Sequence, residues 1–98
     1  MAEVTFASRA LADLERIFDF LATDNRPVAV ATVQASRTGV EVSTSHPFIG
    51  RPAARGRREL ILSRGKSGYV ALCRYAPGLD KVLVLAIRHQ REAGYRVG

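Results

Sequence analysis

The chain has 98 residues, enough for one domain but too few for two independent hydrophobic cores. Hydrophobic residues make up 47% of it and charged residues 24%, a balance that excludes wholesale disorder. The single cysteine, Cys73, excludes an internal disulfide, and without a cluster of Cys and His a structural zinc site is not expected.

The net positive charge of the chain comes from its second half. After Gly50, eleven Lys and Arg face three Asp and Glu, a net charge of +8, whereas the first fifty residues carry a net charge of −2. This asymmetry favours docking on an anionic surface. The sequence does not open on a secretion signal, and its longest apolar run, Val82–Ile87, is too short to span a bilayer. We therefore expect a cytoplasmic protein.

The first half of the chain predicts a strand followed by two helices. Alternating residues over Glu3–Phe6 indicate a short strand at an edge of its sheet. Ser8 is expected to cap a helix over Arg9–Thr23. Pro27 would lose no hydrogen bond at the first position of a second helix, which we expect to run to about Thr44.

The second half predicts a three-stranded antiparallel meander. A loop at His46–Pro52 precedes strands over Arg58–Leu62, Tyr69–Tyr75 and Lys81–Ile87, with turns at Gly65–Gly68 and Pro77–Asp80. The last strand is apolar on both faces and should be central or covered. The elements predict one α+β domain over residues 1–98, in which a short N-terminal strand and a helix hairpin pack on an antiparallel sheet.

Ten apolar side chains are expected to be mostly buried: Leu11, Leu14, Phe18, Leu21, Leu60, Leu62, Val70, Leu72, Val84 and Leu85. Phe6, Phe18 and Phe20 are expected in the core rather than as a platform for stacked bases. Asp13 is assigned to the polar face of the first helix, spaced to pair with Arg9. Cys73 is expected to be a small buried hydrophobe, and His46, before Pro47, a solvated residue at a helix end.

Four stretches carry a resemblance that covers nearly the whole chain in order. They are Ala10–Leu14, His46-Pro47 with Gly50-Arg51-Pro52, Arg58-Glu59-Leu60 followed by Gly68–Tyr75, and Val84–His89. With the order of elements, they make the chain resemble the RelE/ParE family of type II toxins. The resemblance implies the fold above and a cognate antitoxin that binds and neutralises the toxin. Because the net charge is +6, that antitoxin should be acidic, covering apolar surface near the helix hairpin and approaching the basic rim of the sheet.

The family divides by target. ParE-like members poison DNA gyrase, whereas RelE-like members cut messenger RNA in the ribosome and usually carry a dense Lys/Arg cluster and a Tyr near the end of the last strand. In this chain Gln90 follows His89 directly, and lysine is scarce. The resemblance thus implies a ParE-like gyrase inhibitor that acts by binding. A ribosome-dependent messenger-RNA endoribonuclease is the alternative, and a basic domain that only binds nucleic acid is a third and weaker hypothesis.

The candidate target-binding residues surround the end of the last strand: Arg74, Arg88, His89 and Arg91. In the endoribonuclease alternative the catalytic residues would be Arg88, His89, Arg74, Arg64 and Tyr95, because RNA cleavage needs proton transfer and stabilisation of the phosphate. The ParE-like interpretation expects no catalytic residue. Neither one expects a cofactor, a metal, a membrane or a small-molecule substrate.

Structural interpretations stay open beside these functional ones. Arg74 and Arg88 could be snorkelling side chains at the edge of the core. Arg58 could pair with Glu59 or with a helix carboxylate such as Asp13. His89 suits acid–base chemistry, but a hydrogen-bonded residue at a strand end is the commoner role.

Overall fold

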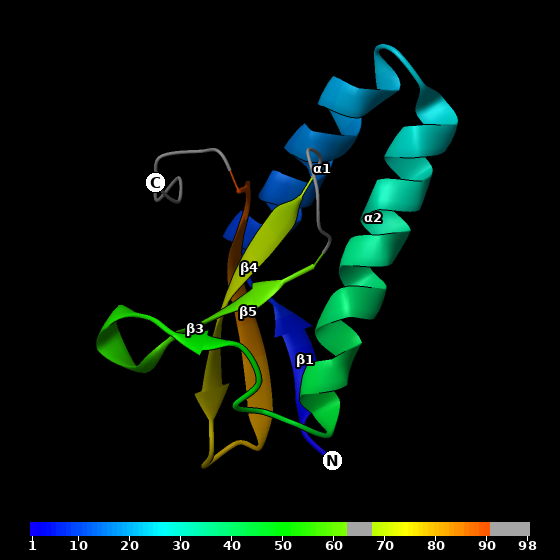
Figure 1. Ribbon diagram of the computed structural model, residues 1–98. Coiled ribbons are helices and arrows are strands. Elements are labelled where there is room, and N and C mark those ends of the chain that lie inside the picture. The colour runs from blue at the N-terminus through cyan, green and yellow to red at the C-terminus, as the bar shows by residue number, and fades with distance from the viewer. Residues whose placement is uncertain (63–67, 91–98) are drawn as a thin grey trace.

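Two helices cover one face of a five-stranded sheet (Figure 1). The computed structural model describes residues 1–62 and 68–90. The elements in chain order are β1 (Glu3–Phe6), α1 (Ser8–Ala22), α2 (Arg26–Glu41), the 3-10 turn η1 (Val42–Thr44), β2 (Arg51–Pro52), the 3-10 turn η2 (Ala54–Gly56), β3 (Arg58–Ile61), β4 (Tyr69–Ala76) and β5 (Lys81–His89). The predicted α+β architecture is confirmed.

The order of strands in the sheet is β1-β5-β4-β3-β2, so β5 is central, as predicted. β3, β4 and β5 form the predicted antiparallel meander. β1 runs parallel to β5, with Phe6 opposite Val84, so the sheet is mixed. β2 lies inside the stretch predicted as a loop. Its proline, Pro52, is tolerated because β2 is an edge strand, where a missing N–H breaks no ladder.

The two helices begin by different means. α1 starts at Ser8 itself, and the residue before it, Ala7, donates its N–H to the carbonyl of Val84, so the prediction that Ser8 caps the helix is wrong. β1 is followed directly by α1, with no hydrogen bond from a capping side chain. α2 is capped by Asn25, whose Oδ1 accepts the N–H of Val28 at 3.2 Å. Pro27 is the second helical residue rather than the first, where its missing N–H is equally harmless.

The core lies between the helices and the sheet, and α1 presents Ala10, Leu14 and Ile17 to it. Leu11, next to Ala10, lies about 100° further round the helix and is 48% exposed, so its predicted burial is wrong. Phe20 is 74% exposed, so it is not a core residue. Of the other predicted core residues, five are buried and four are half-buried: Leu14, Leu60, Val70, Leu72 and Val84, then Phe18, Leu21, Leu62 and Leu85.

Gly50 is required by the close approach of the chain to β3. Its φ is +102°, and a Cβ there would lie 2.5 Å from the carbonyl oxygen of Glu59. That oxygen belongs to backbone paired in the sheet, so it cannot move aside as a side chain could. The glycine of the Gly50-Arg51-Pro52 stretch therefore sets the entry of the chain into β2.

Gly50→Ala is expected to lower the free energy of unfolding by about 1–3 kcal/mol, because the new Cβ adds backbone strain and a clash. Urea denaturation followed by circular dichroism measures this. Gly78→Ala is the matched control, since a Cβ at Gly78 meets nothing within 4 Å and its φ is not positive. If the two variants unfold at the same urea concentration, the close approach does not constrain the fold.

Candidate functional site

Arg88 and His89, at the C-terminal end of β5, lie on opposite faces of the sheet. His89 is opposite Tyr69, a core residue on the helix side, and the two rings meet edge-on with centroids 5.3 Å apart. Arg88 is opposite Val70, on the face that the helices do not cover. Neighbours along a strand point to opposite faces, so these two candidate side chains do not converge.

A β-bulge at Leu85 determines that His89, and not Arg88, lies on the helix side of the sheet. Leu72 pairs with Ala86 and Cys73 with Val84, which leaves Leu85 as the extra residue. Before the bulge Val84 joins the helix-side core, and after it Ile87 does. Without the bulge, strict alternation from Val84 would turn Arg88 into the core.

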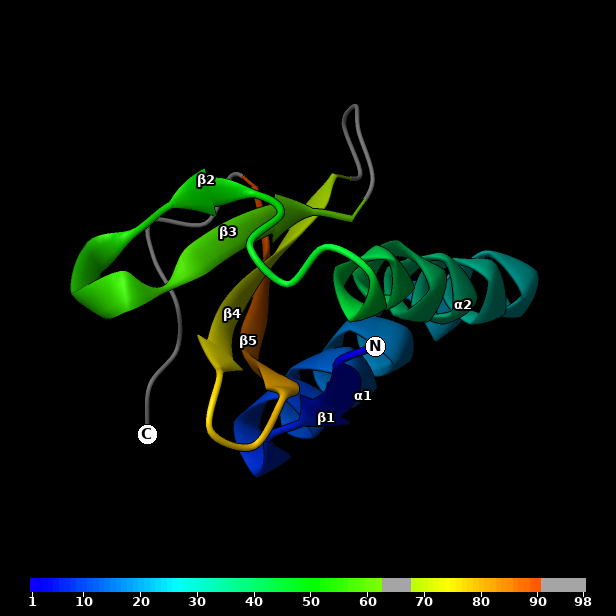
Figure 2. The same ribbon diagram turned by 90° about the horizontal axis from the view of Figure 1, so that it is seen from below.

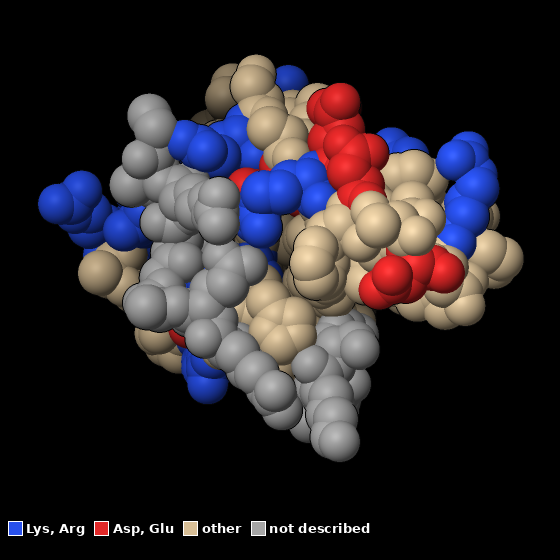
Figure 3. All heavy atoms as spheres, turned by 90° about the horizontal axis from the view of Figure 1, so that it is seen from above, with Lys and Arg blue, Asp and Glu red and all other residues tan. Residues whose placement is uncertain are grey.

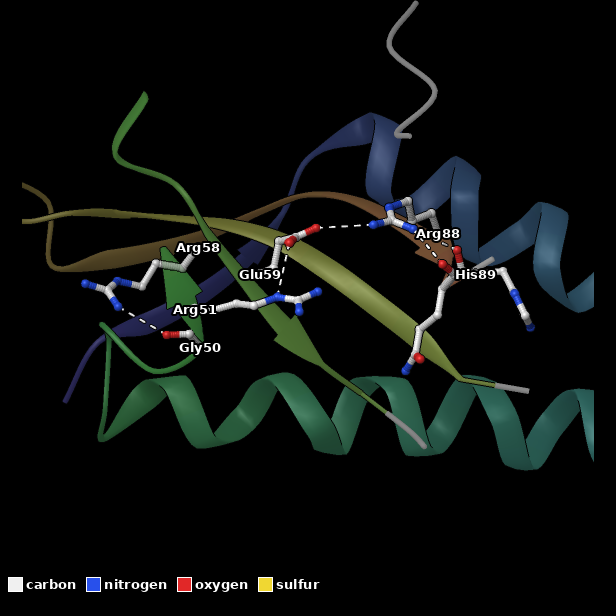
Figure 4. A network of polar contacts seen from close by, with 7 residues as sticks. Gly50, Arg51, Arg58, Glu59, Arg88 and His89 are labelled. Atoms are coloured by element: carbon white, nitrogen blue, oxygen red, sulfur yellow. Dashed lines mark hydrogen bonds and ion pairs between the residues drawn. The ribbon is translucent and has the colours of Figure 1, made fainter. Parts of the chain in front are cut away.

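Glu59 lies between Arg88 and Arg51 (Figure 4). Its Oε2 is 3.4 Å from Nη2 of Arg88, and its Oε1 is 3.3 Å from Nε of Arg51. Arg88 also donates from Nη1 to the carbonyls of His89 and Gln90, at 3.1 and 3.2 Å. With a side chain only 15% exposed, Arg88 links β5 to β3 and contacts the backbone of His89 and Gln90. These contacts support a structural role for it beside any role in binding.

Arg74 lies on the same face as Arg88 but at a distance along the sheet. Four residues of β4 separate it from Val70, the residue opposite Arg88, which corresponds to about 13 Å of strand. The exposed Arg74 side chain donates from Nη2 to the carbonyl of Arg55 at 2.9 Å. The structure therefore ties Arg74 to the β2–β3 hairpin and Arg88 to Glu59.

Arg58 forms neither of the ion pairs considered for it, with Glu59 or with a helix carboxylate. Its Nη1 donates to the carbonyl of Gly50 at 3.1 Å, and its guanidinium lies 5.6 Å from the ring centroid of Phe48. Phe48 in turn meets Tyr75 edge-on at 5.1 Å. The hydroxyl of Tyr75 donates to Asp80 at 2.8 Å, and this hydrogen bond raises the pKa of Tyr75.

Three candidate residues, Arg64, Arg91 and Tyr95, lie outside the described residues, as does most of the turn predicted at Gly65–Gly68. Within residues 1–62 and 68–90, no group of three or more His, Cys, Asp and Glu side chains could hold a metal ion. In those same ranges no helix is long and apolar enough to cross a membrane. Cys73 is buried as predicted, and burial raises the pKa of its thiol to about 11. His46 is exposed, also as predicted.

Asp13 is a buried residue that the sequence analysis placed on the polar face of α1. It is 2% exposed, and its Oδ2 accepts the N–H of Ile87 at 2.8 Å. β1 pairs with β5 only as far as Val84, so the carboxylate takes the place of a neighbouring strand. Its ionic partner is Arg16, at 3.8 Å, rather than the predicted Arg9. The spacing of Asp13 from Ala10 and Ile17, three residues before it and four after it, could have revealed this position.

Asp13→Ala is expected to cost about 1–3 kcal/mol of unfolding free energy, because it leaves the buried N–H of Ile87 without an acceptor. Hydrogen exchange of the Ile87 amide should accelerate in the same variant. Asp19→Ala, on the exposed side of α1, is the control and should change stability by less than about 0.5 kcal/mol. Slow exchange at Ile87 in Asp13→Ala would show that another group satisfies that amide.

Comparison with known proteins shows that the chain is similar to toxins. Residues 4–94 match the family described as the ParE toxin of the type II toxin-antitoxin system parDE. Toxin RelE3 of Caulobacter vibrioides is 30% identical over 92 residues, which cover 94% of this chain and 98% of that protein.

Two solved structures share the fold. A chain of the chromosomal ParDE system from P. aeruginosa superimposes with a TM-score of 0.75 at 24% identity, covering 91% of this chain and 96% of that one. A chain of the intact E. coli RelBE toxin-antitoxin complex does so with a TM-score of 0.65 at 13% identity, covering 94% of this chain and 100% of that one.

Proposed function

The chain belongs to the RelE/ParE family and is the toxin of a type II toxin-antitoxin system, and from this premise we propose that it is a ParE-like inhibitor of DNA gyrase. It docks on gyrase in the cytoplasm, breaks no covalent bond and arrests growth. Arg74, Arg88, His89 and Arg91 are the proposed target-binding residues. The match of residues 4–94 to the ParE toxin family supports this branch.

The observation that carries the proposal is the separation of the candidate side chains. A ribonuclease needs an acid–base group and phosphate-binding cations within hydrogen-bonding reach of one phosphodiester. In the described part of the chain, His89 faces the helix side, Arg88 faces the other side next to Glu59, and Arg74 lies about 13 Å along the strand. Separate contacts of this kind suit a binding surface better than a reaction centre.

The second candidate function is a ribosome-dependent messenger-RNA endoribonuclease. The name of the 30% identical relative, Toxin RelE3, favours it. In that case Arg88, His89 and Arg74, with Arg64 and Tyr95 beyond the described residues, would have to converge on RNA bound in the ribosome. The two functions make opposite predictions about His89, which the Discussion develops.

A cognate antitoxin is the proposed partner, because solved structures that share this fold come from toxin-antitoxin systems. The net charge of +6 favours an acidic antitoxin. Apolar side chains exposed on the helix hairpin offer surface for it to cover: Leu11, Phe20, Val28 and Val30. Purification of the chain from its native operon should yield a small acidic protein in the same complex, and a chain eluting alone would contradict the proposal.

Brief expression of the chain without its antitoxin tests the target. A gyrase inhibitor should induce the DNA-damage response and change plasmid supercoiling while messenger RNA stays intact. Rapid cleavage of translated messenger RNA, with supercoiling unchanged, would instead establish the endoribonuclease.

A further inference from the structure

The β2–β3 hairpin projects from the sheet, away from the helices (Figure 2). Residues 50–58 contain four arginines and no Asp, Glu, His, Lys or Tyr. We use "arginine hairpin" for Arg55, Arg57 and Arg58 together with Arg74 of β4, which contacts the hairpin. In Figure 3, blue side chains stand out at the left edge, on the hairpin side, whereas red and blue side chains occur together toward the helices.

Backbone carbonyls hold these arginines in place. Arg74 donates to the carbonyl of Arg55 at 2.9 Å, Arg57 donates from Nε to Ala54 at 3.0 Å, and Arg58 donates to Gly50 at 3.1 Å. Arg55 itself has a φ of 62°, a left-handed conformation that few non-glycine residues adopt and that turns the chain at the hairpin tip. The contacts position the guanidinium groups of Arg57, Arg58 and Arg74 before any ligand arrives, and for Arg55 they position the backbone.

An exposed aromatic ring lies at the inner end of the arginine hairpin. Phe48 is 61% exposed, with the guanidinium of Arg58 5.6 Å from its centroid and Tyr75 edge-on behind it. It borders a shallow hollow of about 570 Å³ lined by Ser45, His46, Pro47, Phe48 and Ile49. Arginines followed by an open aromatic ring match the two needs of a single nucleic-acid strand, which are phosphate neutralisation and base stacking.

We propose that the arginine hairpin and Phe48 form a binding site for single-stranded nucleic acid that has no preference for a particular nucleotide sequence. Arg55, Arg57 and Arg74 contact successive phosphates, and a base stacks on Phe48 beside Arg58. The site shares Arg74 with the proposed target-binding residues, but Arg74 lies about 13 Å along β4 from the level of Arg88, so the site is centred away from the end of β5. Residues 50–58 carry no acid–base side chain, so the hairpin itself is suited to binding phosphates rather than to cleaving them.

The contributions of the arginines and of Phe48 can be distinguished in one assay. The purified full-length chain is titrated into a short labelled oligothymidylate at several salt concentrations. Arg55→Asn with Arg57→Gln removes two cations, with Asn chosen because it tolerates positive φ. This double variant should bind more weakly. Its plot of log K against log salt should be less steep by about 1.4, or 0.7 for each lost phosphate contact. Phe48→Ala should weaken binding roughly 5- to 150-fold with an unchanged slope.

Arg37→Gln, on the exposed surface of α2, removes one charge elsewhere and should leave the slope unchanged. All variants are first compared with wild type by urea denaturation. Three results would overturn the proposal: a slope reduced equally by Arg37→Gln, duplex DNA bound as tightly as the single strand, or polyglutamate displacing the oligonucleotide at equal charge. The last would indicate a surface for an acidic protein segment. Because the assay contains neither gyrase nor ribosome, its outcome is independent of the proposed function.

Discussion

Replacing Arg88 with alanine is expected to raise the concentration of toxin needed to inhibit gyrase by about 30-fold or more. Loss of a desolvated charge contact at an interface typically costs about 2–5 kcal/mol. Arg91→Ala, at a position beyond the described residues, is also expected to weaken inhibition. His89→Gln should leave much of the inhibition intact, because in the binding mechanism His89 transfers no proton. Supercoiling assays with each purified variant measure these effects.

Arg88 also pairs with Glu59 within the fold, so Arg88→Ala has to be compared with a second variant. Arg88→Ala leaves the carboxylate of Glu59, 18% exposed, without the guanidinium 3.4 Å away. Arg88→Ala combined with Glu59→Gln removes both charges and separates lost target contact from lost stability. Normal inhibition by a folded double variant would show that Arg88 serves the fold alone.

The endoribonuclease alternative reverses the order of these effects. There, His89→Gln should slow RNA cleavage by about 10²- to 10⁴-fold, the usual loss when a general acid or base is removed. A folded His89→Gln protein without toxicity, alongside messenger-RNA cleavage by the wild type, would contradict the binding mechanism.

Leu14→Ala is expected to lower the free energy of unfolding by about 2–5 kcal/mol, because Leu14 is 7% exposed and packs between α1 and the sheet. Leu11→Ala is the matched control, three residues earlier on the same helix and 48% exposed. It should cost less than about 1 kcal/mol. Chemical denaturation of both variants measures the difference. Equal losses would mean that the helix face that packs on the sheet is misassigned.

Much of the fold could be predicted because periodicity and turn residues act locally. Alternation identified β1, Pro27 marked the start of α2 to within a residue, and the doubly apolar character of Lys81–Ile87 identified β5 as central. The predicted burial of Leu11 was wrong because a one-residue rotation of a helix is decided by what it packs against. β2 was missed because two residues on an edge strand give no period to detect.

The candidate site was less predictable, because it depends on contacts between residues far apart in sequence. Alternation from Val84 turns Arg88 toward the core, and only the bulge at Leu85 reverses this. The roles of Glu59 and Asp13 depend on pairings across 29 and 74 residues. A sequence shows that these carboxylates exist but not that one holds Arg88 and the other the N–H of Ile87.

Inhibition of purified DNA gyrase by the purified chain, free of antitoxin, tests the central claim most directly. The proposal predicts that the wild-type protein blocks supercoiling in a concentration-dependent way, that His89→Gln does so nearly as well, and that neither cleaves messenger RNA in a reconstituted translation reaction. Full supercoiling at every toxin concentration, together with cleavage of ribosome-bound messenger RNA that His89→Gln abolishes, would contradict it.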